Sequence, residues 1–106
     1  MSLISHANNK LVCAEEGGLQ SLIPNRIQIG PWETFTLIDL GGGNVALQSH
    51  ANNRYVCAED GGKSPLIANR DAIGPWETFK VTNLWEWSNK IYIKYFFVLQ
   101  LINTIR

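Results

Sequence analysis

The sequence predicts an all-β protein built from two copies of one four-stranded unit. Residues 5–40 and 49–84 are identical at 23 of 36 aligned positions, at a constant offset of 44 residues and without a gap. Glycine or proline interrupts every candidate helix, and short apolar stretches alternate with turns rich in asparagine and glycine. The repeat and the turn spacing together indicate a small fold of short strands.

Each copy is expected to contain four strands separated by tight turns. In the first copy 2–6 is expected to serve as the first strand, and Gly41–Asn44 links the copies. The turns of the second copy fall at 52–53, 60–62 and 74–75, where asparagine and glycine tolerate a positive φ. Its predicted strands are Val45–His50, Arg54–Glu59, Leu66–Asn69 and Trp76–Leu84.

Four strands in about 44 residues suit either a propeller blade or one lobe of a β-trefoil. A propeller needs at least about four blades, and this chain has room for two. A trefoil needs three lobes, so 106 residues leave room for two full lobes and a shortened third. The expected single domain 1–106 then comprises repeat 1 (1–40), repeat 2 (45–84) and a degenerate third lobe (85–106).

Three ordered blocks of the second copy carry a family resemblance. They are His-Ala-Asn-Asn-Arg-Tyr-Val-Cys-Ala-Glu-Asp-Gly-Gly (50–62), Pro-Leu-Ile-Ala-Asn-Arg (65–70) and Ile-Gly-Pro-Trp-Glu-Thr-Phe (73–79). Together they resemble the repeat of fascin-like β-trefoils, in both the bacterial and the actin-crosslinking versions. The resemblance covers 1–84. It implies a β-trefoil fold and a non-catalytic binding domain. The partner of such a domain is either a glycan, namely a polysaccharide, or an actin filament.

The C-terminal segment 85–106 departs from the repeat. It is interpreted as one or two strands that fill the first half of the third lobe, with loss of the natural repeat by truncation or a frame change as the alternative. An incomplete lobe leaves an unpaired strand edge, so a homo-oligomer through 85–106 is expected. Trp85 and Trp87 share a strand face, where they either cover a core or interface or stack on sugar rings.

Charge and composition exclude several classes of partner. Nine basic and nine acidic residues cancel, which argues against nucleic acid. No apolar run reaches the length of a membrane span, and the start of the chain lacks the pattern of a signal peptide. A cytoplasmic location is the default, with secretion as part of a larger protein left open. No cofactor is implied, and two cysteines and two histidines 44 residues apart match no zinc spacing.

The candidate ligand contacts are polar residues that return at the repeat offset. Asn amides both donate and accept hydrogen bonds, which suits sugar hydroxyls, although turn chemistry is the simpler explanation. His6 and His50 precede hairpins, where a hydrogen bond that stabilises the turn is the alternative to ligand contact. The full candidate set is Asn8, Asn9, Asn25, Arg26, His50, Asn52, Asn53, Asn69, Arg70, Trp85 and Trp87.

Other repeated residues are assigned to the core. The repeated aromatic residues are expected to fill or cap it, with a ligand platform as the alternative; they are Trp32, Trp76, Phe35 and Phe79. Cys13 and Cys57 are expected to be small buried residues.

The adjacent acidic residues 15–16 and 59–60 point to opposite faces if they lie on strands, so they cannot flank a glycosidic bond together. The sequence thus predicts no enzyme activity. It leaves three hypotheses: a carbohydrate-binding module, an actin-filament binder and a structural domain without a ligand.

Overall fold

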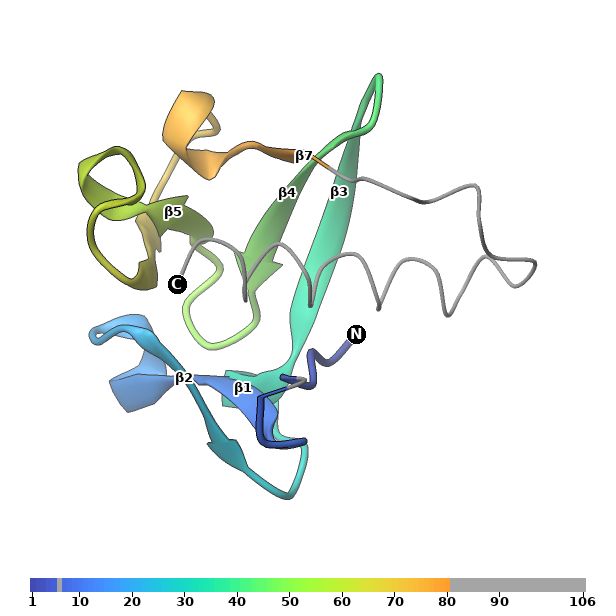
Figure 1. Cartoon of the computed structure of the whole chain (residues 1–106), viewed down its shortest axis with the longest axis vertical. Coiled ribbons are helices and arrows are strands. Elements are labelled where there is room, and N and C mark those ends of the chain that lie inside the picture. The colour runs from blue at the N-terminus through green and yellow to red at the C-terminus, as the bar shows by residue number, and fades with distance from the viewer. Residues whose placement is uncertain (6, 81–106) are drawn as a thin grey trace.

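A computed structural model describes residues 1–5 and 7–80 of the chain. These residues form seven strands and four short 3-10 helices, and they contain no α-helix, so the all-β prediction is confirmed (Figure 1). The elements of the first repeat are β1 (Leu11–Ala14), η1 (Glu15–Gly18), β2 (Leu22–Arg26), η2 (Pro31–Glu33) and β3 (Phe35–Gly41). Those of the second are β4 (Asn44–Ser49), β5 (Tyr55–Ala58), η3 (Glu59–Gly62), β6 (Leu66–Arg70), η4 (Pro75–Glu77) and β7 (Phe79–Lys80).

The two repeats form two lobes joined by a shared hairpin. Among the strands of the described residues, β1 pairs with β2 alone, whereas β3, β4, β5 and β6 form one antiparallel sheet in that order, with β7 also paired to β4. The predicted linker at Gly41–Asn44 is therefore the tight turn of the β3–β4 hairpin. Figure 1 shows this hairpin upright beside the β1–β2 and β5 segments, which lie one below the other. The hairpin thus joins the two lobes, because β3 belongs to the first repeat and pairs with β4 of the second.

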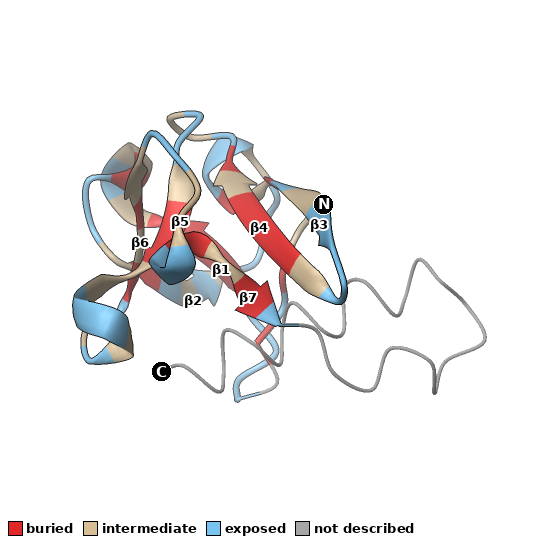
Figure 2. Cartoon of the chain, turned by 90° about the horizontal axis from the view of Figure 1, so that it is seen from above, coloured by how far each residue is buried: buried red, intermediate tan, exposed pale blue. Residues whose placement is uncertain are grey.

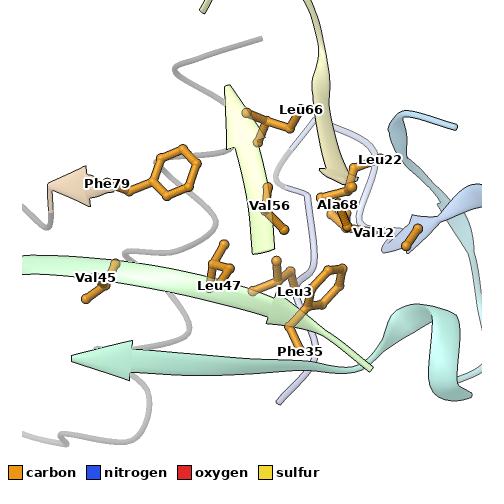
Figure 3. Close-up of a cluster of buried hydrophobic side chains, with 11 residues drawn as sticks. Leu3, Val12, Leu22, Phe35, Val45, Leu47, Val56, Leu66, Ala68 and Phe79 are labelled. Carbon is orange, nitrogen blue, oxygen red and sulfur yellow. The ribbon is translucent and has the colours of Figure 1, made fainter. Parts of the chain in front are cut away.

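One hydrophobic core runs through both lobes. Each repeat contributes equivalent side chains: Val12 and Val56 are fully buried, as is Phe35, and Phe79 is 3% exposed. Most residues of β4 and the two central residues of β5 are buried, and Figure 2 shows these parts of both strands in red. Figure 3 shows the side chains of this cluster converging from strands of both repeats. Two hydrogen bonds of 2.7 Å join the main chain of Met1 to that of Phe35, so the N-terminus lies against the same core.

Two of the predicted strands are shorter than expected. Within 2–6, the described residues make one isolated bridge, from Ile4 to Leu11, rather than a strand. The strand predicted to begin at Trp76 begins instead at Phe79, because Pro75–Glu77 forms the 3-10 turn η4. Proline sets the backbone angle of the first residue of this turn, and the Glu77 carboxylate caps it by accepting a hydrogen bond from the Gly74 N–H.

Four predictions fall on the C-terminal residues 81–106 or on His6. The third lobe, the oligomer contact through 85–106 and the assignments of Trp85 and Trp87 all lie outside the described residues. The role of His6 lies outside them as well. Among the described residues, no helix is long and apolar enough to cross a membrane.

Candidate binding site

Each repeat contains a polar cluster in which one arginine lies between two glutamates. In the second repeat, Arg70 Nη2 donates to Glu59 Oε1 at 2.6 Å, and its Nε lies 3.7 Å from Glu77 Oε2. Asn69 Nδ2 also donates to Glu59, at 3.0 Å. The arginine offsets the charge of both carboxylates, and Glu77 is almost fully buried. The cluster thus connects β6 to η3 and η4 within one lobe.

The first repeat contains the same cluster with the same geometry. Arg26 bonds Glu15 at 3.1 and 3.2 Å, and its Nε lies 3.9 Å from Glu33. Asn25 Nδ2 donates to Glu15. Four candidate ligand residues, Asn25, Arg26, Asn69 and Arg70, therefore hold the turns of their own lobes. This internal role explains why the three repeated sequence blocks occur together, because each block supplies one part of the cluster.

The acidic pairs do not lie on strands, which corrects the geometry expected for them. Glu15 and Glu59 begin the 3-10 turns η1 and η3, and Glu16 and Asp60 follow with positive φ values of 52° and 54°. Glu15 turns toward Arg26, whereas Glu16 is exposed. No group of three potential metal ligands occurs within residues 1–5 and 7–80.

The asparagine pairs stabilise the hairpins. Asn52 Nδ2 donates to the Ala68 carbonyl at 2.8 Å, and its Oδ1 accepts from the Arg54 N–H at 3.0 Å. Asn8 makes the equivalent bonds to Pro24 and Lys10. Asn9 and Asn53 have φ values of 58° and 59°, a conformation that asparagine tolerates better than most residues. The turn explanation for these four candidates therefore agrees with their geometry.

His50 lies at the surface, just after β4. Its Nε2 lies 2.7 Å from the Thr36 hydroxyl, and its backbone N–H donates to the Thr34 carbonyl at 3.0 Å. The histidine therefore connects β4 to the start of β3. Among the described residues, His50 makes no hydrogen bond to any of the asparagine or arginine candidates.

The two lobes meet where the η1 turn of the first repeat packs against the β5–β6 hairpin of the second. We call this contact the joint. Gly18 is buried with a φ of 97°, and a Cβ at this position would overlap the Asn52 amide, lying 2.8 Å from its Cγ. Glycine is therefore required at position 18 for both its backbone angle and its lack of a side chain.

A cavity of about 320 Å³ opens at the joint. Such a volume lies at the lower end of the range of about 300–1,000 Å³ that is usual for small-ligand sites. The Asn69 Oδ1 atom is buried and accepts no hydrogen bond from any described residue. Gly17, Gly18 and Leu19 line one wall, and Arg54, Ile67 and Asn69 line the other. The joint thus brings amide and guanidinium groups together with two apolar side chains.

Equivalent residues of the two repeats differ in burial at the joint, because each repeat contributes a different part of its surface to it. Ala68 is buried in the second lobe, whereas its counterpart Pro24 is only half-buried. Asn69 is likewise half-buried and its counterpart Asn25 exposed. On the other side, Gly18 is buried, but no described atom lies within 4 Å of a Cβ built on its counterpart Gly62. The described residues therefore form this cavity once, between repeat 1 and repeat 2.

The assignment of Trp32 and Trp76 to the core is wrong. They are 37% and 43% exposed, because each is the middle residue of a 3-10 turn at the surface rather than part of a strand. The Trp32 indole lies over Gly17, with its Nε1 3.7 Å from a Cβ built there. The phenylalanine three residues later is the buried aromatic of each repeat.

The two cysteines are free, and both are fully buried, which confirms their predicted role. Burial raises the pKa of the Cys13 and Cys57 thiols from 9.0 to about 12, and hydrogen bonds to Glu33 and Glu77 add to the shift. Both thiols therefore stay protonated at neutral pH and are poor nucleophiles.

We expect the native thiols to react with a disulfide reagent at about pH 8 roughly a thousandfold more slowly than in denaturant, because the thiolate fraction falls tenfold per pKa unit. The folded state also holds these protons more tightly than the unfolded state. The resulting stabilisation is complete below about pH 9 and is lost as the pH rises toward 12. Rapid labelling of either native thiol would contradict its burial.

Comparison with known proteins identifies the fold. No protein-family description and no curated protein sequence matches the chain. Among solved structures, the crystal structure of the designed 3-fold symmetric protein ThreeFoil matches with a TM-score of 0.69 and 18% identity. The chain has a β-trefoil-like fold. The alignment covers 78% of this chain and 64% of ThreeFoil, so the chain spans just under two thirds of that trefoil.

The trefoil arrangement explains why sequence reasoning missed the joint. The cavity forms between consecutive lobes, and its walls come from residues about 35 to 50 positions apart. Leu19, Arg54 and Ile67 were not among the candidates, although Asn52 and Asn69 were. The available signal was a difference between the copies: Leu19 aligns with Lys63, and Arg54 aligns with Lys10. Such differences mark places where the two lobes of the trefoil have different surroundings.

Proposed function

We propose that the chain is a non-catalytic carbohydrate-binding module of the fascin-like type, with its binding site in the cavity at the joint. The observation that carries this proposal is that Asn69, one of the residues that line the cavity, has a buried side-chain oxygen, Oδ1, that accepts no hydrogen bond from any described residue. A sugar hydroxyl is a suitable donor for such an acceptor. Leu19 and Ile67 supply the apolar contacts that the C–H faces of a sugar ring require.

The geometry of the carboxylates supports the non-catalytic part of the proposal. In each repeat the neighbouring glutamates bind one arginine between them, as Glu59 and Glu77 bind Arg70. Carboxylates that act on a glycosidic bond must instead flank an open space of about 5–10 Å. We therefore assign these glutamates to stability rather than to hydrolysis.

A panel of glycans tests the proposal. The full chain is incubated with insoluble β-glucan, xylan and chitin and with soluble acidic polysaccharides, beside actin filaments in a co-sedimentation assay. We expect at least one glycan to bind and actin not to co-sediment with the chain. Retention by no glycan at all would overturn the proposal, and co-sedimentation with actin alone would favour an actin-filament binder.

A matched pair of variants locates the site. Asn69→Ala removes the unpaired acceptor and should weaken glycan binding about tenfold, the effect of one good hydrogen bond. Asn25→Ala removes the repeat-equivalent amide, which makes the same bond to a glutamate but lies outside the joint. It should therefore lose similar stability and retain full binding. Equal affinity of the two variants would place the site elsewhere on the chain.

A further inference from the structure

Arg54 differs from the other two arginines that bond described carboxylates. Arg26 and Arg70 each interact with two glutamates of their own lobe. Arg54 interacts with one acidic residue of the described chain, Asp71, through an Nε–Oδ1 distance of 3.6 Å. Asp71 is 82% exposed, and an exposed ion pair of this kind contributes little stability. The guanidinium of Arg54 is thus only weakly engaged.

The remaining contact of Arg54 is also weak. Its Nη1 lies 3.5 Å from the Asn69 carbonyl oxygen, at the outer limit of a hydrogen bond. A guanidinium carries five N–H donors in a planar fork, so most of its donors bond no described residue. Arg54 also supplies the one charge among the residues that line the cavity. The charge that the lining residues themselves present to the cavity is therefore positive, with Asp71 as its exposed partner outside the lining.

We infer that the cavity at the joint takes an acidic sugar, whose carboxylate pairs with Arg54 while a ring hydroxyl donates to Asn69 Oδ1. This inference rests on the proposed carbohydrate-binding function and names the class of sugar. An arginine and a carboxylate form two parallel hydrogen bonds, which are stronger than bonds between neutral groups. A uronic acid carries both required groups, a carboxylate and ring hydroxyls. Asp71 is the carboxylate that the ligand displaces.

The test compares acidic polymers with their own neutral esters. Polygalacturonate and alginate are titrated into the full chain by calorimetry, each beside its esterified form, which differs in charge but not in the sugar. We expect the acidic polymer to bind at least about tenfold more tightly than its ester, as a charge-assisted hydrogen bond requires. The affinity should also fall as salt is added.

Variants of Arg54 connect this preference to the joint. Arg54→Gln should remove the difference between acid and ester, and Arg54→Lys should retain part of it, because lysine keeps the charge without the fork. Lys10→Gln is the matched control: Lys10 is the exposed repeat counterpart of Arg54 and does not line the cavity. It should bind both polymers as the unchanged chain does.

The outcomes separate this inference from the proposed function. Equal binding of acid and ester, or binding of neutral glycans alone, would overturn the acidic-sugar inference and leave the carbohydrate-binding function standing. A preference for acid that survives in Arg54→Gln would also overturn it, because another cation would then bind the carboxylate. Binding of no glycan at all would overturn both.

Discussion

Replacing Gly18 by alanine should destabilise the protein far more than the same change at Gly62. The two glycines occupy equivalent positions and have nearly equal φ values of 97° and 96°, so both variants bear a similar backbone strain of about 1–3 kcal/mol. Only the alanine at position 18 also overlaps Asn52. Overpacking of this kind costs about 1–3 kcal/mol more.

Asn52 cannot easily move away from the new side chain. Its amide is held by bonds to the Ala68 carbonyl and the Arg54 N–H, and displacement breaks both. Urea unfolding of the two variants measures the difference, with equal losses contradicting the tight joint. Because the Asn52 side chain also lines the cavity, Gly18→Ala should weaken glycan binding, whereas Gly62→Ala should not.

Truncation of Phe35 should be the most destabilising core change that we consider. Phe35 is completely buried at the start of β3, where it contacts the cluster shared by both lobes (Figure 3). Removal of a buried phenylalanine side chain costs about 3–5 kcal/mol, a large part of the total stability of about 5–15 kcal/mol that is usual for a domain. Phe35→Ala should therefore shift the urea midpoint strongly or leave the chain unfolded.

Two further variants keep this prediction measurable. Phe35→Leu retains most of the apolar volume and should cost only about 1–2 kcal/mol, so it folds even if the alanine variant does not. Ile27→Ala truncates an aliphatic side chain that is 82% exposed, and its effect should stay within about 0.5 kcal/mol. A small loss for Phe35→Ala, similar to that of Ile27→Ala, would contradict the burial of Phe35.

The repeat predicted the lobes well because it constrains local structure. The turns at 52–53 and 60–62 form where asparagine and glycine were expected to allow a positive φ. β1 is buried along its whole length and β5 at its two central residues, so neither strand alternates between buried and exposed residues. Trp32 and Trp76 were wrongly assigned to the core. Hydrophobicity alone does not show that the proline before each of them starts a 3-10 turn, which leaves the tryptophan at the surface. Glu33 and Glu77 cap these turns from inside the lobe.

The candidate site was predicted only in part. Asn52 and Asn69 were chosen for the hydrogen-bonding capacity of their amides, and the structure places both at the joint. Arg26 and Arg70 were chosen because they repeat, but the repetition reflects ion pairs inside each lobe. A pattern shared by both copies identifies what each lobe needs for its own stability. At the joint, Gly18, Asn52 and Asn69 are identical to their repeat counterparts. Leu19 and Arg54 differ from theirs, so a search for repeated residues overlooks these two.

The asymmetry of the joint limits how far the two repeats can be interchanged. Inside each lobe the two copies meet the same neighbours, and Cys, Glu, Asn and Arg of the polar cluster have stayed identical. At the joint the copies meet different neighbours, and here Leu19 has diverged from Lys63, and Lys10 from Arg54. An exchange of the two repeats in chain order would place Lys63 beside Lys10, two like charges where a leucine now lies near an arginine. Two nearly equal lobes thus make an unequal contact, and the residues at that contact are not interchangeable between the copies.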